Sequence, residues 1–245
     1  MFYPAQKNIG RLEVIDIGIS DEIIEDLKVQ VFENTPDLWL DSLPVPSAIG
    51  HKYDRGHCAV LGGGLKSMGA GRIAARCALR SGAGAVTLLC APSALMAYSI
   101  SLDAVMVQSL GDPKDLRDWI ALKRIASILI GPGNGVSDRT RAIVIEALNT
   151  EANVILDADA LTVFKDDPGF LFDEISKKEA GRVILTPHEA EFARIFDFEG
   201  TVLERCQKGS MDVTEWIVWF LFQVKSAATV STKKLHKIRL STLLW

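Results

Sequence analysis

Four short segments of the chain combine glycine with polar side chains in patterns that could bind an anionic ligand. The first is the run 61–71, Leu-Gly-Gly-Gly-Leu-Lys-Ser-Met-Gly-Ala-Gly, which follows a short apolar stretch. Glycines let backbone N–H groups approach an anion at a helix N-terminus. The run is not a P-loop, because it lacks the Lys-Ser/Thr pair, and Ser67 breaks the Gly-x-Gly-x-x-Gly pattern. It indicates either an anion site that includes Gly64, Gly69 and Ala70 or a flexible strand-to-helix turn.

Two further segments place small or acidic residues after apolar runs. In Gly-Pro-Gly-Asn-Gly, the glycines Gly131, Gly133 and Gly135 leave little steric bulk, so either a flat ring or phosphate rests there or the segment is a plain turn. Asp157 and Asp159 stand two apart, and side chains two apart on a strand point to the same face. Such a carboxylate pair suits Mg²⁺ or sugar hydroxyls. The alternative is a helix N-cap with a solvated neighbour.

The fourth segment reads Thr-Pro-His-Glu-Ala-Glu and contains a histidine without an obvious structural role. Thr186 is expected as a helix N-cap, Pro187 as the first helical residue, and the acids in the first turn. His188 is then either a substrate contact or a polar group satisfied within the fold. His51 and Lys52, upstream of the first core strand, are expected to be either anion contacts or surface residues.

These segments follow apolar runs that alternate with amphipathic stretches. Runs typical of buried strands lie at 58–62, 85–91, 127–131, 154–157 and 182–185, and helical periodicity covers 70–80, 137–148 and 189–196. The alternation predicts an α/β fold with a mostly parallel sheet covered on both faces. Ligands of such folds bind outside the carboxyl ends of the strands. We therefore expect the four segments to meet along one edge of the sheet.

Composition limits the partners that the chain can have. Its 245 residues, 26.8 kDa and 48% hydrophobic content suit a folded domain. A net charge of −4 argues against a nucleic-acid partner, and no apolar run reaches the roughly 18 residues of a membrane helix. No secretory signal is visible at the start. The four cysteines lack metal-ligand spacing, so we expect buried reduced thiols in a cytoplasmic protein and no metal ligands.

The two ends of the chain differ from the middle. Residues 1–46 hold a strand-like run at 11–18 and an acidic helical stretch, and they end at a linker in which Pro44 and Pro46 disfavour a helix. Residues 206–245 hold one glycine, no proline and three of the five tryptophans. Six basic and two acidic residues give this tail a charge of +4, which leaves −8 for the rest. We interpret the tail as either a divergent helical ending or a sequence that has left its reading frame.

Taken together, the motifs resemble those of the ADP/ATP-dependent NAD(P)H-hydrate dehydratase family. The matching pieces are His51-Lys52 with Gly56, Gly62–Gly64, Gly69-Ala70, Arg80–Gly84, Gly131–Gly135, Leu156–Leu161, and Thr186–His188 with Glu191-Phe192. The likeness covers residues 47–205. It implies a ribokinase-like three-layer α/β/α domain with a mostly parallel sheet, incomplete at its C-terminus. Residues 9–18 are similar to the closing strand of a hydrate epimerase domain, a remnant from which we expect no epimerase activity.

The resemblance implies repair of a nicotinamide cofactor that has been damaged by addition of water. The family uses ADP or ATP to phosphorylate the ring hydroxyl of the S epimer of hydrated NADH or NADPH. Elimination of phosphate, a far better leaving group than hydroxide, then restores the cofactor and leaves AMP or ADP. By motif matching, Ala70, Gly133 and His188 would contact the dinucleotide, and Asp157 and Asp159 would lie near Mg²⁺ or substrate. Further contacts are expected from Gly64, Gly69, Gly131 and Gly135, and relatives suggest a homo-oligomer.

The chain departs from the family pattern after Arg205. A Lys-Gly segment that helps hold the nucleotide and a Gly-x-Gly-Asp loop are expected there; the loop supplies an anion hole and the aspartate that activates the hydroxyl. Lys208-Gly209 is only a dipeptide, and Asp212 has no glycine loop around it. We therefore expect no catalytic residue in this chain. Three alternatives stay open: an active dehydratase, an inactive remnant that at most binds the dinucleotide, and another ribokinase-like small-molecule kinase, against which the Thr-Pro-His and Gly-Pro-Gly motifs speak.

Overall fold

The computed structural model of the chain describes residues 49–179 and 182–196 without interruption. Before them it describes 15–27, 31–33 and 40–42 with single positions at 8, 10, 13 and 36, and after them two strands at 218–224 and 227–231. The sequence-based expectations for the linker prolines and for the tail positions concern residues outside the described ones; these are Pro44, Pro46, Lys208, Gly209 and Asp212.

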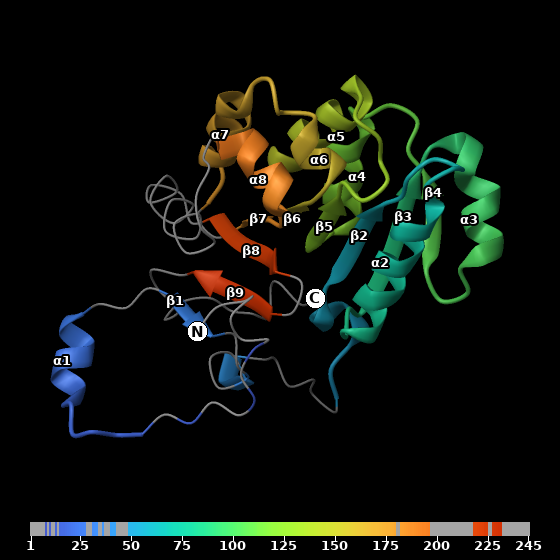
Figure 1. Ribbon diagram of the computed structural model, residues 1–245. Helices are drawn as coiled ribbons and strands as arrows, with labels where there is room; N and C mark the ends of the chain where they lie inside the picture. The colour runs from blue at the N-terminus through green and yellow to red at the C-terminus, as the bar shows by residue number, and fades with distance from the viewer. Residues whose placement is uncertain are drawn as a thin grey trace.

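A parallel sheet forms the centre of the fold (Figure 1). Six strands pair in parallel in the order β4-β3-β2-β5-β6-β7. They are β2 (His57–Leu61), β3 (Ala85–Cys90), β4 (Met106–Ser109), β5 (Ser127–Ile130), β6 (Asn153–Leu156) and β7 (Val183–Leu185). This arrangement confirms the α/β fold with a mostly parallel sheet.

Three more strands extend the sheet beyond β7. Strand β8 (Val218–Val224) pairs in parallel with β7, and β9 (Ala227–Ser231) and β1 (Val31–Glu33) follow in antiparallel pairing. The expectation of a helical ending is therefore wrong for the described part of the tail. The strand expected at 11–18 is also not formed by residues 15–18, whose apolar side chains Ile15 and Ile17 are about four-fifths exposed, at 78% and 80%.

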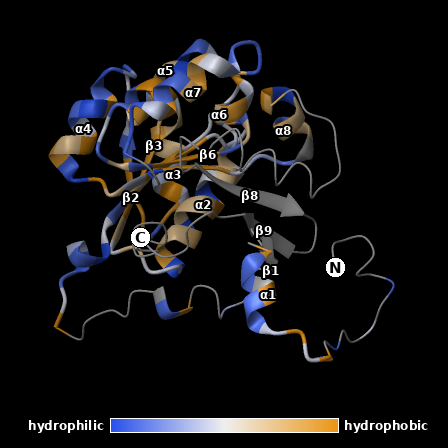
Figure 2. Ribbon diagram, turned by 90° about the vertical axis from the view of Figure 1, so that its left-hand side faces the viewer, coloured by the Kyte–Doolittle hydropathy of each residue, from blue (hydrophilic) through white to orange (hydrophobic). Residues whose placement is uncertain are grey.

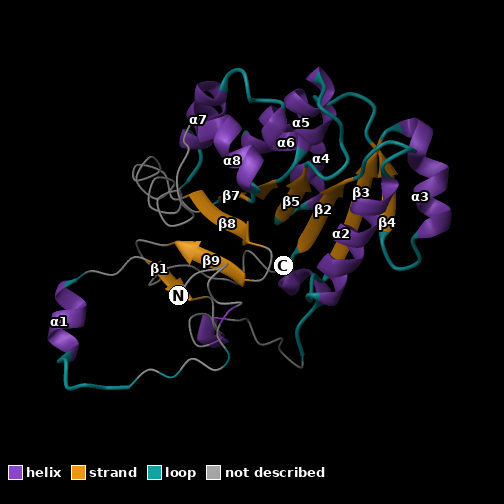
Figure 3. Ribbon diagram, viewed as in Figure 1, coloured by secondary structure: helices purple, strands orange, loops and turns teal. Residues whose placement is uncertain are grey.

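Helices cover both faces of the sheet, so the molecule has three layers (Figure 3). Helices α2 (Met68–Arg80) and α3 (Leu95–Ser101) lie on one face, after the 3₁₀ turns η4 (Lys52–Arg55) and η5 (Pro92–Ala94). The other face carries α4 (Asp115–Lys123), α5 (Asp138–Leu148), α6 (Asp159–Thr162), α7 (Pro168–Ser176) and α8 (Glu189–Phe196). Helix α1 (Asp21–Asp26) and η3 (Leu40–Ser42) belong to the N-terminal part. Of the helices in the described ranges, none is both long and apolar enough to span a bilayer.

Alternation along each strand explains why the core has two halves. On β2, Cys58 and Val60 pack toward α2 and α3, whereas Ala59 and Leu61 pack toward α4 and α5. Because both faces are covered, the strand sequences are continuous apolar runs instead of alternating ones. Figure 2 shows hydrophobic residues on the central strands and hydrophilic residues on the outer sides of the helices. Of the cysteines, Cys58 and Cys90 are buried free thiols as expected, but Cys77 is exposed.

Candidate functional site

The direction in which the strands are added reverses between β2 and β5. Strands β3 and β4 are added on one side of β2, and β5, β6 and β7 on the other. The loops that follow β2 and β5 therefore lead to helices on opposite faces of the sheet, which is the position where ligands of such folds bind. We call residues 62–67, 131–135, 157–158 and 186–188, which follow β2, β5, β6 and β7, the loop cluster. Backbone bonds from Asp157 N to Ile130 O (3.1 Å) and from Thr186 N to Leu156 O (3.1 Å) hold these loops side by side.

The first two glycine-rich loops touch each other directly. The Ser67 hydroxyl donates to the carbonyl oxygen of Gly133 at 2.6 Å. A Cβ atom on Gly63 would lie 2.0 Å from that same oxygen, so only glycine allows this approach. Ala70 lies in the first turn of α2, one turn after Ser67. The structure thus brings the sequence-predicted residues Ala70 and Gly133 to the same junction.

Two side chains brace this junction from outside the predicted set. The Asn134 side chain donates to Leu61 O at 2.9 Å and accepts from Gly131 N at 2.6 Å. The Tyr98 hydroxyl, fully buried under α2, donates to Gly63 O at 3.0 Å. Burial raises the pKa of Tyr98 to about 12, so the hydroxyl keeps its proton and remains a donor.

The loop after β5 is joined in the same way to the loop after β6. Gly131 has φ +133°, and a Cβ atom there would lie 1.6 Å from the carbonyl oxygen of Asp157. The N–H of Gly135 donates to a carboxylate oxygen of Asp159 at 2.8 Å. Both predicted aspartates therefore lie against the glycine loop that contains Gly133.

The aspartate pair does not share a strand face, contrary to the expectation from its spacing. Strand β6 ends at Leu156 and α6 begins at Asp159. The turn between them is made by Ala158 at φ 50° and ψ −116°, a conformation that normally requires glycine. Asp157 accepts from Ala158 N at 2.9 Å, while Asp159 reaches the other way to Gly135. Burial raises the pKa of Asp157, and hydrogen bonds from Thr186 and Ala158 N only partly offset this.

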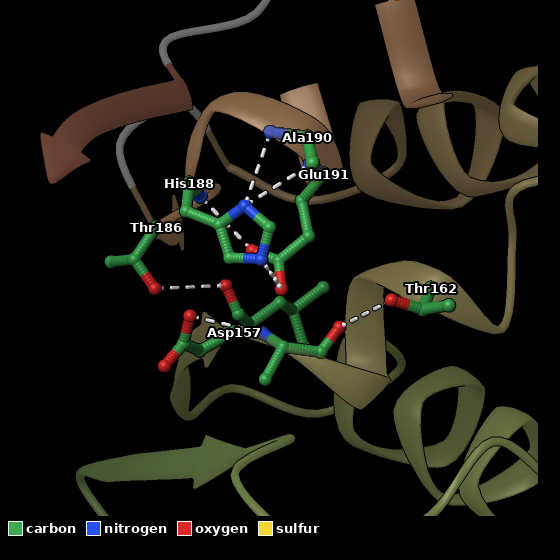
Figure 4. A network of polar contacts seen from close by, with 8 residues as sticks. Asp157, Thr162, Thr186, His188, Ala190 and Glu191 are labelled. Carbon is green, nitrogen blue, oxygen red and sulfur yellow. Dashed lines mark hydrogen bonds and ion pairs between the residues drawn. The ribbon is translucent and has the colours of Figure 1, made fainter. Parts of the chain in front are cut away.

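His188 caps helix α8 (Figure 4). Its Nδ1 accepts from the N–H groups of Ala190 (3.1 Å) and Glu191 (3.4 Å), and the Glu191 carboxylate accepts from the His188 N–H at 2.9 Å. This is a capping box with histidine in the N-cap position. The expectation that Thr186 is the N-cap is wrong, because α8 begins at Glu189 and the Thr186 hydroxyl donates to Leu156 O at 3.4 Å.

The two ring nitrogens of His188 are thus both engaged within the fold. Nε2 lies 3.0 Å from Glu191 Oε1, so the Nε2–H tautomer satisfies both partners. The side chain is nevertheless 51% exposed beside Asp157. A ligand would therefore meet the ring surface of His188 and not a free nitrogen.

The sequence model of the NAD(P)H-hydrate dehydratases matches residues 58–227, more than half of the chain. The chain belongs to the NAD(P)H-hydrate dehydratase family. The match reaches past residue 205, where the motif resemblance stops, and takes in β8.

Relatives of this dehydratase family member include longer, bifunctional proteins. The chain is 30% identical over 201 residues to the bifunctional NAD(P)H-hydrate repair enzyme of Dictyoglomus turgidum, covering 77% of this chain but 38% of that protein. It is 32% identical over 161 residues to the ADP-dependent (S)-NAD(P)H-hydrate dehydratase of Staphylococcus aureus, covering 64% and 55%. The chain thus spans only about two fifths of the bifunctional relatives' length, at 38%.

Solved structures confirm the ribokinase-like fold of the family member. A ribokinase-like superfamily protein from Enterococcus faecalis superimposes with a TM-score of 0.66 at 18% identity, over 82% of this chain and 68% of that one. The ADP/ATP-dependent NAD(P)H-hydrate dehydratase of Bacillus subtilis, co-crystallized with ATP and Mg²⁺, gives 0.63 at 23% identity, over 80% and 68%.

Not every sequence-predicted position of this dehydratase family member joins the loop cluster. His51 caps η4 and accepts from Tyr53 N, with Asp54 accepting from His51 N at 2.6 Å. The carbonyl of Lys52 packs against Gly84 just before β3, at the amino ends of the strands, so this segment lies at the opposite edge of the sheet. His51 and Lys52 are exposed there, which favours the surface interpretation over the anion-contact one.

The remaining candidate glycines lie in or next to the loop cluster. Gly64 and Gly69 are exposed next to Ser67, and Gly135 is exposed beside Asp159. Within the described ranges, no group of three His, Cys, Asp or Glu side chains is arranged to hold a metal ion. Sequence reasoning missed Ser67 as a loop contact, and it missed Asn134 and Tyr98. Ser67 and Asn134, each inside a glycine-rich motif, carried a local signal, and Tyr98 carried none.

Proposed function

We propose that the loop cluster binds the S epimer of hydrated NADH or NADPH. The observation that carries the proposal is the direct junction of the glycine loops after β2 and β5, joined by the 2.6 Å hydrogen bond from Ser67 to Gly133 at the point where the strand order reverses. Backbone amides and glycines at such a point suit the pyrophosphate and flat rings of a dinucleotide. Ala70, Gly133 and the exposed ring of His188 are the proposed contacts.

The proposed chemistry of the family site is a dehydration driven by a nucleotide. The terminal phosphoryl group of ADP or ATP moves to the hydroxyl of the hydrated ring, which leaves AMP or ADP. The C–O bond then breaks with loss of phosphate and of a ring proton, and the double bond of the reduced cofactor returns. The relatives named ADP-dependent and ATP-dependent dehydratases support this pair of co-substrates.

Mg²⁺ belongs to this proposal as a companion of the nucleotide phosphates. The described carboxylates do not form a resident metal site, because Asp159 is bonded to Gly135 N and Asp157 to Ala158 N. A divalent ion held mainly by phosphate and water needs only one or two protein carboxylates. Asp157 fits the role of such a carboxylate better than Asp159, because burial disfavours its charged form until a cation approaches.

We further propose that the chain as printed binds the dinucleotide without turning it over. The support for this proposal is that residues 206–245 contain no Gly-x-Gly-Asp segment, which in the family pattern supplies the anion hole for the transferred phosphate and the base for the hydroxyl. The proposed cellular setting is the cytoplasm, in keeping with the free thiols of Cys58, Cys77 and Cys90, and a homo-oligomer is the proposed assembly, to be checked by light scattering.

One experiment separates binding from turnover. Hydrated NADH is titrated into the protein by calorimetry, and in parallel the recovery of NADH is followed with ADP or ATP and Mg²⁺. Saturable binding without NADH recovery is the expected result. Absence of binding would refute the site, and recovery at an ordinary enzymatic rate would refute the proposed loss of catalysis.

The encoding DNA provides an independent test of how the catalytic loop was lost. Translation of all frames past codon 205 is expected to recover a Gly-x-Gly-Asp loop in another frame. Because the family match continues to residue 227, the change of reading frame is looked for on both sides of that codon, and not at codon 205 alone. A tail without such a loop in any frame would contradict a change of reading frame.

A further inference from the structure

The glycine loop 131–135 is held from both sides by side chains of neighbouring loops. On one side, the Ser67 hydroxyl donates to the carbonyl oxygen of Gly133 at 2.6 Å. On the other side, the Asp159 carboxylate accepts from the N–H of Gly135 at 2.8 Å. These two bonds join three loops that leave three different strands, namely β2, β5 and β6.

The Ser67 hydroxyl is used in a way that its position does not predict. Ser67 is the N-cap residue of α2, where a serine hydroxyl usually accepts from the helix's own N–H groups. It makes no such bond, and instead donates to Gly133 and more weakly to Gly64 O at 3.4 Å. The Ser67 hydroxyl therefore does not stabilise the start of α2, and its principal hydrogen bond is the one to Gly133.

The Asp159 carboxylate is likewise directed at the loop. Asp159 is the first residue of α6, and one of its carboxylate oxygens is bonded to Gly135 N across 24 residues of sequence. A charge-assisted bond to a backbone N–H is stronger than one between neutral groups. It fixes the end of the glycine loop at which α5 begins three residues later.

We propose that Ser67 and Asp159 are positioning residues that hold loop 131–135 between them and thereby fix where Gly133 stands relative to the loop after β2. This inference rests on the proposed function, because Gly133 is one of the proposed dinucleotide contacts. Neither side chain needs to touch the ligand. Asp159 acts through Gly135 N, which distinguishes it from a ligand of Mg²⁺ or of a sugar hydroxyl.

The conservative variants separate positioning from direct contact. Ser67→Thr and Asp159→Asn each keep the hydrogen-bonding oxygen, whereas Ser67→Ala and Asp159→Ala remove it. Calorimetric titration with hydrated NADH is expected to give about a tenfold weaker Kd for each alanine variant, in keeping with one lost hydrogen bond. Ser67→Thr and Asp159→Asn are expected to stay within about threefold of the parent protein. Equal loss in Asp159→Asn and Asp159→Ala would overturn the proposal, since it would show that the negative charge itself contacts ligand or metal.

A second readout tests the same bonds without any ligand. Amide hydrogen exchange of the apo protein is expected to quicken in peptides covering 131–135 in both alanine variants, and to quicken much less in Asp159→Asn, which keeps a weaker, neutral bond to Gly135 N. Ser99→Ala and Asp115→Ala remove an exposed serine and an exposed first-turn aspartate elsewhere, and they serve as controls that leave exchange in this loop unchanged.

The two readouts fail in different ways. If the parent protein does not bind hydrated NADH, the proposed function falls, while quickened exchange in the alanine variants still supports the positioning bonds. If exchange in loop 131–135 is the same in Ser67→Ala, in Asp159→Ala and in the parent protein, the positioning proposal is refuted whatever the titration gives.

Discussion

Adding one methyl group at Gly63 is the sharpest test of the loop junction. The new Cβ would lie 2.0 Å from the carbonyl oxygen of Gly133 and 2.5 Å from the Ser67 hydroxyl. Because real Cβ contacts are at least 3.0 Å, the backbone of one loop must shift by 1.0 Å, the difference between 3.0 and 2.0 Å. A shift of that size takes the 2.6 Å bond between Ser67 and Gly133 out of hydrogen-bonding range.

Two contributions then add in Gly63→Ala. Overpacking against a backbone oxygen costs about 1–3 kcal/mol, and the lost hydrogen bond costs about 1 kcal/mol. The free energy of unfolding is therefore expected to fall by about 2–4 kcal/mol, which lowers the urea midpoint by about 1–2 M at an m-value near 2 kcal/mol/M. Dinucleotide binding is expected to be lost with it, because the two loops no longer meet.

The neighbouring glycine gives a matched control for this prediction. A Cβ on Gly64 meets nothing within 4 Å, so Gly64→Ala should change the free energy of unfolding by less than about 0.5 kcal/mol. Both variants are compared with the parent protein by urea unfolding followed by circular dichroism. A midpoint for Gly63→Ala equal to that of Gly64→Ala would show that the loops are not in contact, and the reasoning would fail.

Three further variants test local strain and buried charge. Ala158→Gly relieves the φ 50°, ψ −116° conformation and is expected to raise the free energy of unfolding by about 1 kcal/mol; a lower urea midpoint would contradict it. Burial lowers the pKa of Lys178 to about 8, so the folded protein binds fewer protons than the unfolded chain between about pH 8 and 10.5. Stability of the parent protein should therefore rise with pH in that window relative to Lys178→Gln, and parallel urea midpoints would refute this. Burial raises the pKa of Asp157, so its ionised form lowers the stability of the folded protein at pH 7. Asp157→Asn is therefore expected to be more stable than the parent protein at pH 7, and the difference should vanish below pH 3.8, where the carboxyl is protonated in both states. Thermal melts at pH 7 and below pH 3.8 check this.

The strands that the sequence predicted share one physical feature, which is burial on both faces. The runs at 58–62, 85–91 and 127–131 agree with β2, β3 and β5 to within one residue at each end. Strand β4 at the sheet edge was not predicted, because its residues alternate between exposed and half-buried and carry no continuous apolar run. Burial on both faces produces the continuous apolar run by which a strand is recognised, so an edge strand that is partly exposed is hard to recognise from hydrophobicity alone.

The candidate site was predictable as a set of loops but not as a set of contacts. Glycine-rich and acidic motifs after apolar runs correctly indicated the edge of the sheet where Gly131 and Asp157 meet. Which side chain bonds to which loop depends on how the sheet brings distant segments together, as for Ser67 and Gly133, which are 66 residues apart in the sequence. Local capping rules failed at Thr186 for the same reason, since its hydroxyl bonds across to the neighbouring strand and leaves the cap to His188.

The position of the loop cluster within the sheet supports the proposal that this chain binds the dinucleotide without turning it over. The contacts that build it come from residues between Leu61 and Glu191. The strands that carry them are β2, β5, β6 and β7, and each has a parallel neighbour on both sides. The described part of the tail, strands β8 and β9, lies on the far side of β7. The bonds among Ser67, Gly133 and Asp159 involve no residue after 205, so the proposed loss of the catalytic loop would leave them in place. Dinucleotide affinity should consequently be insensitive to substitutions in β9, whereas it should depend strongly on the junction at Gly63.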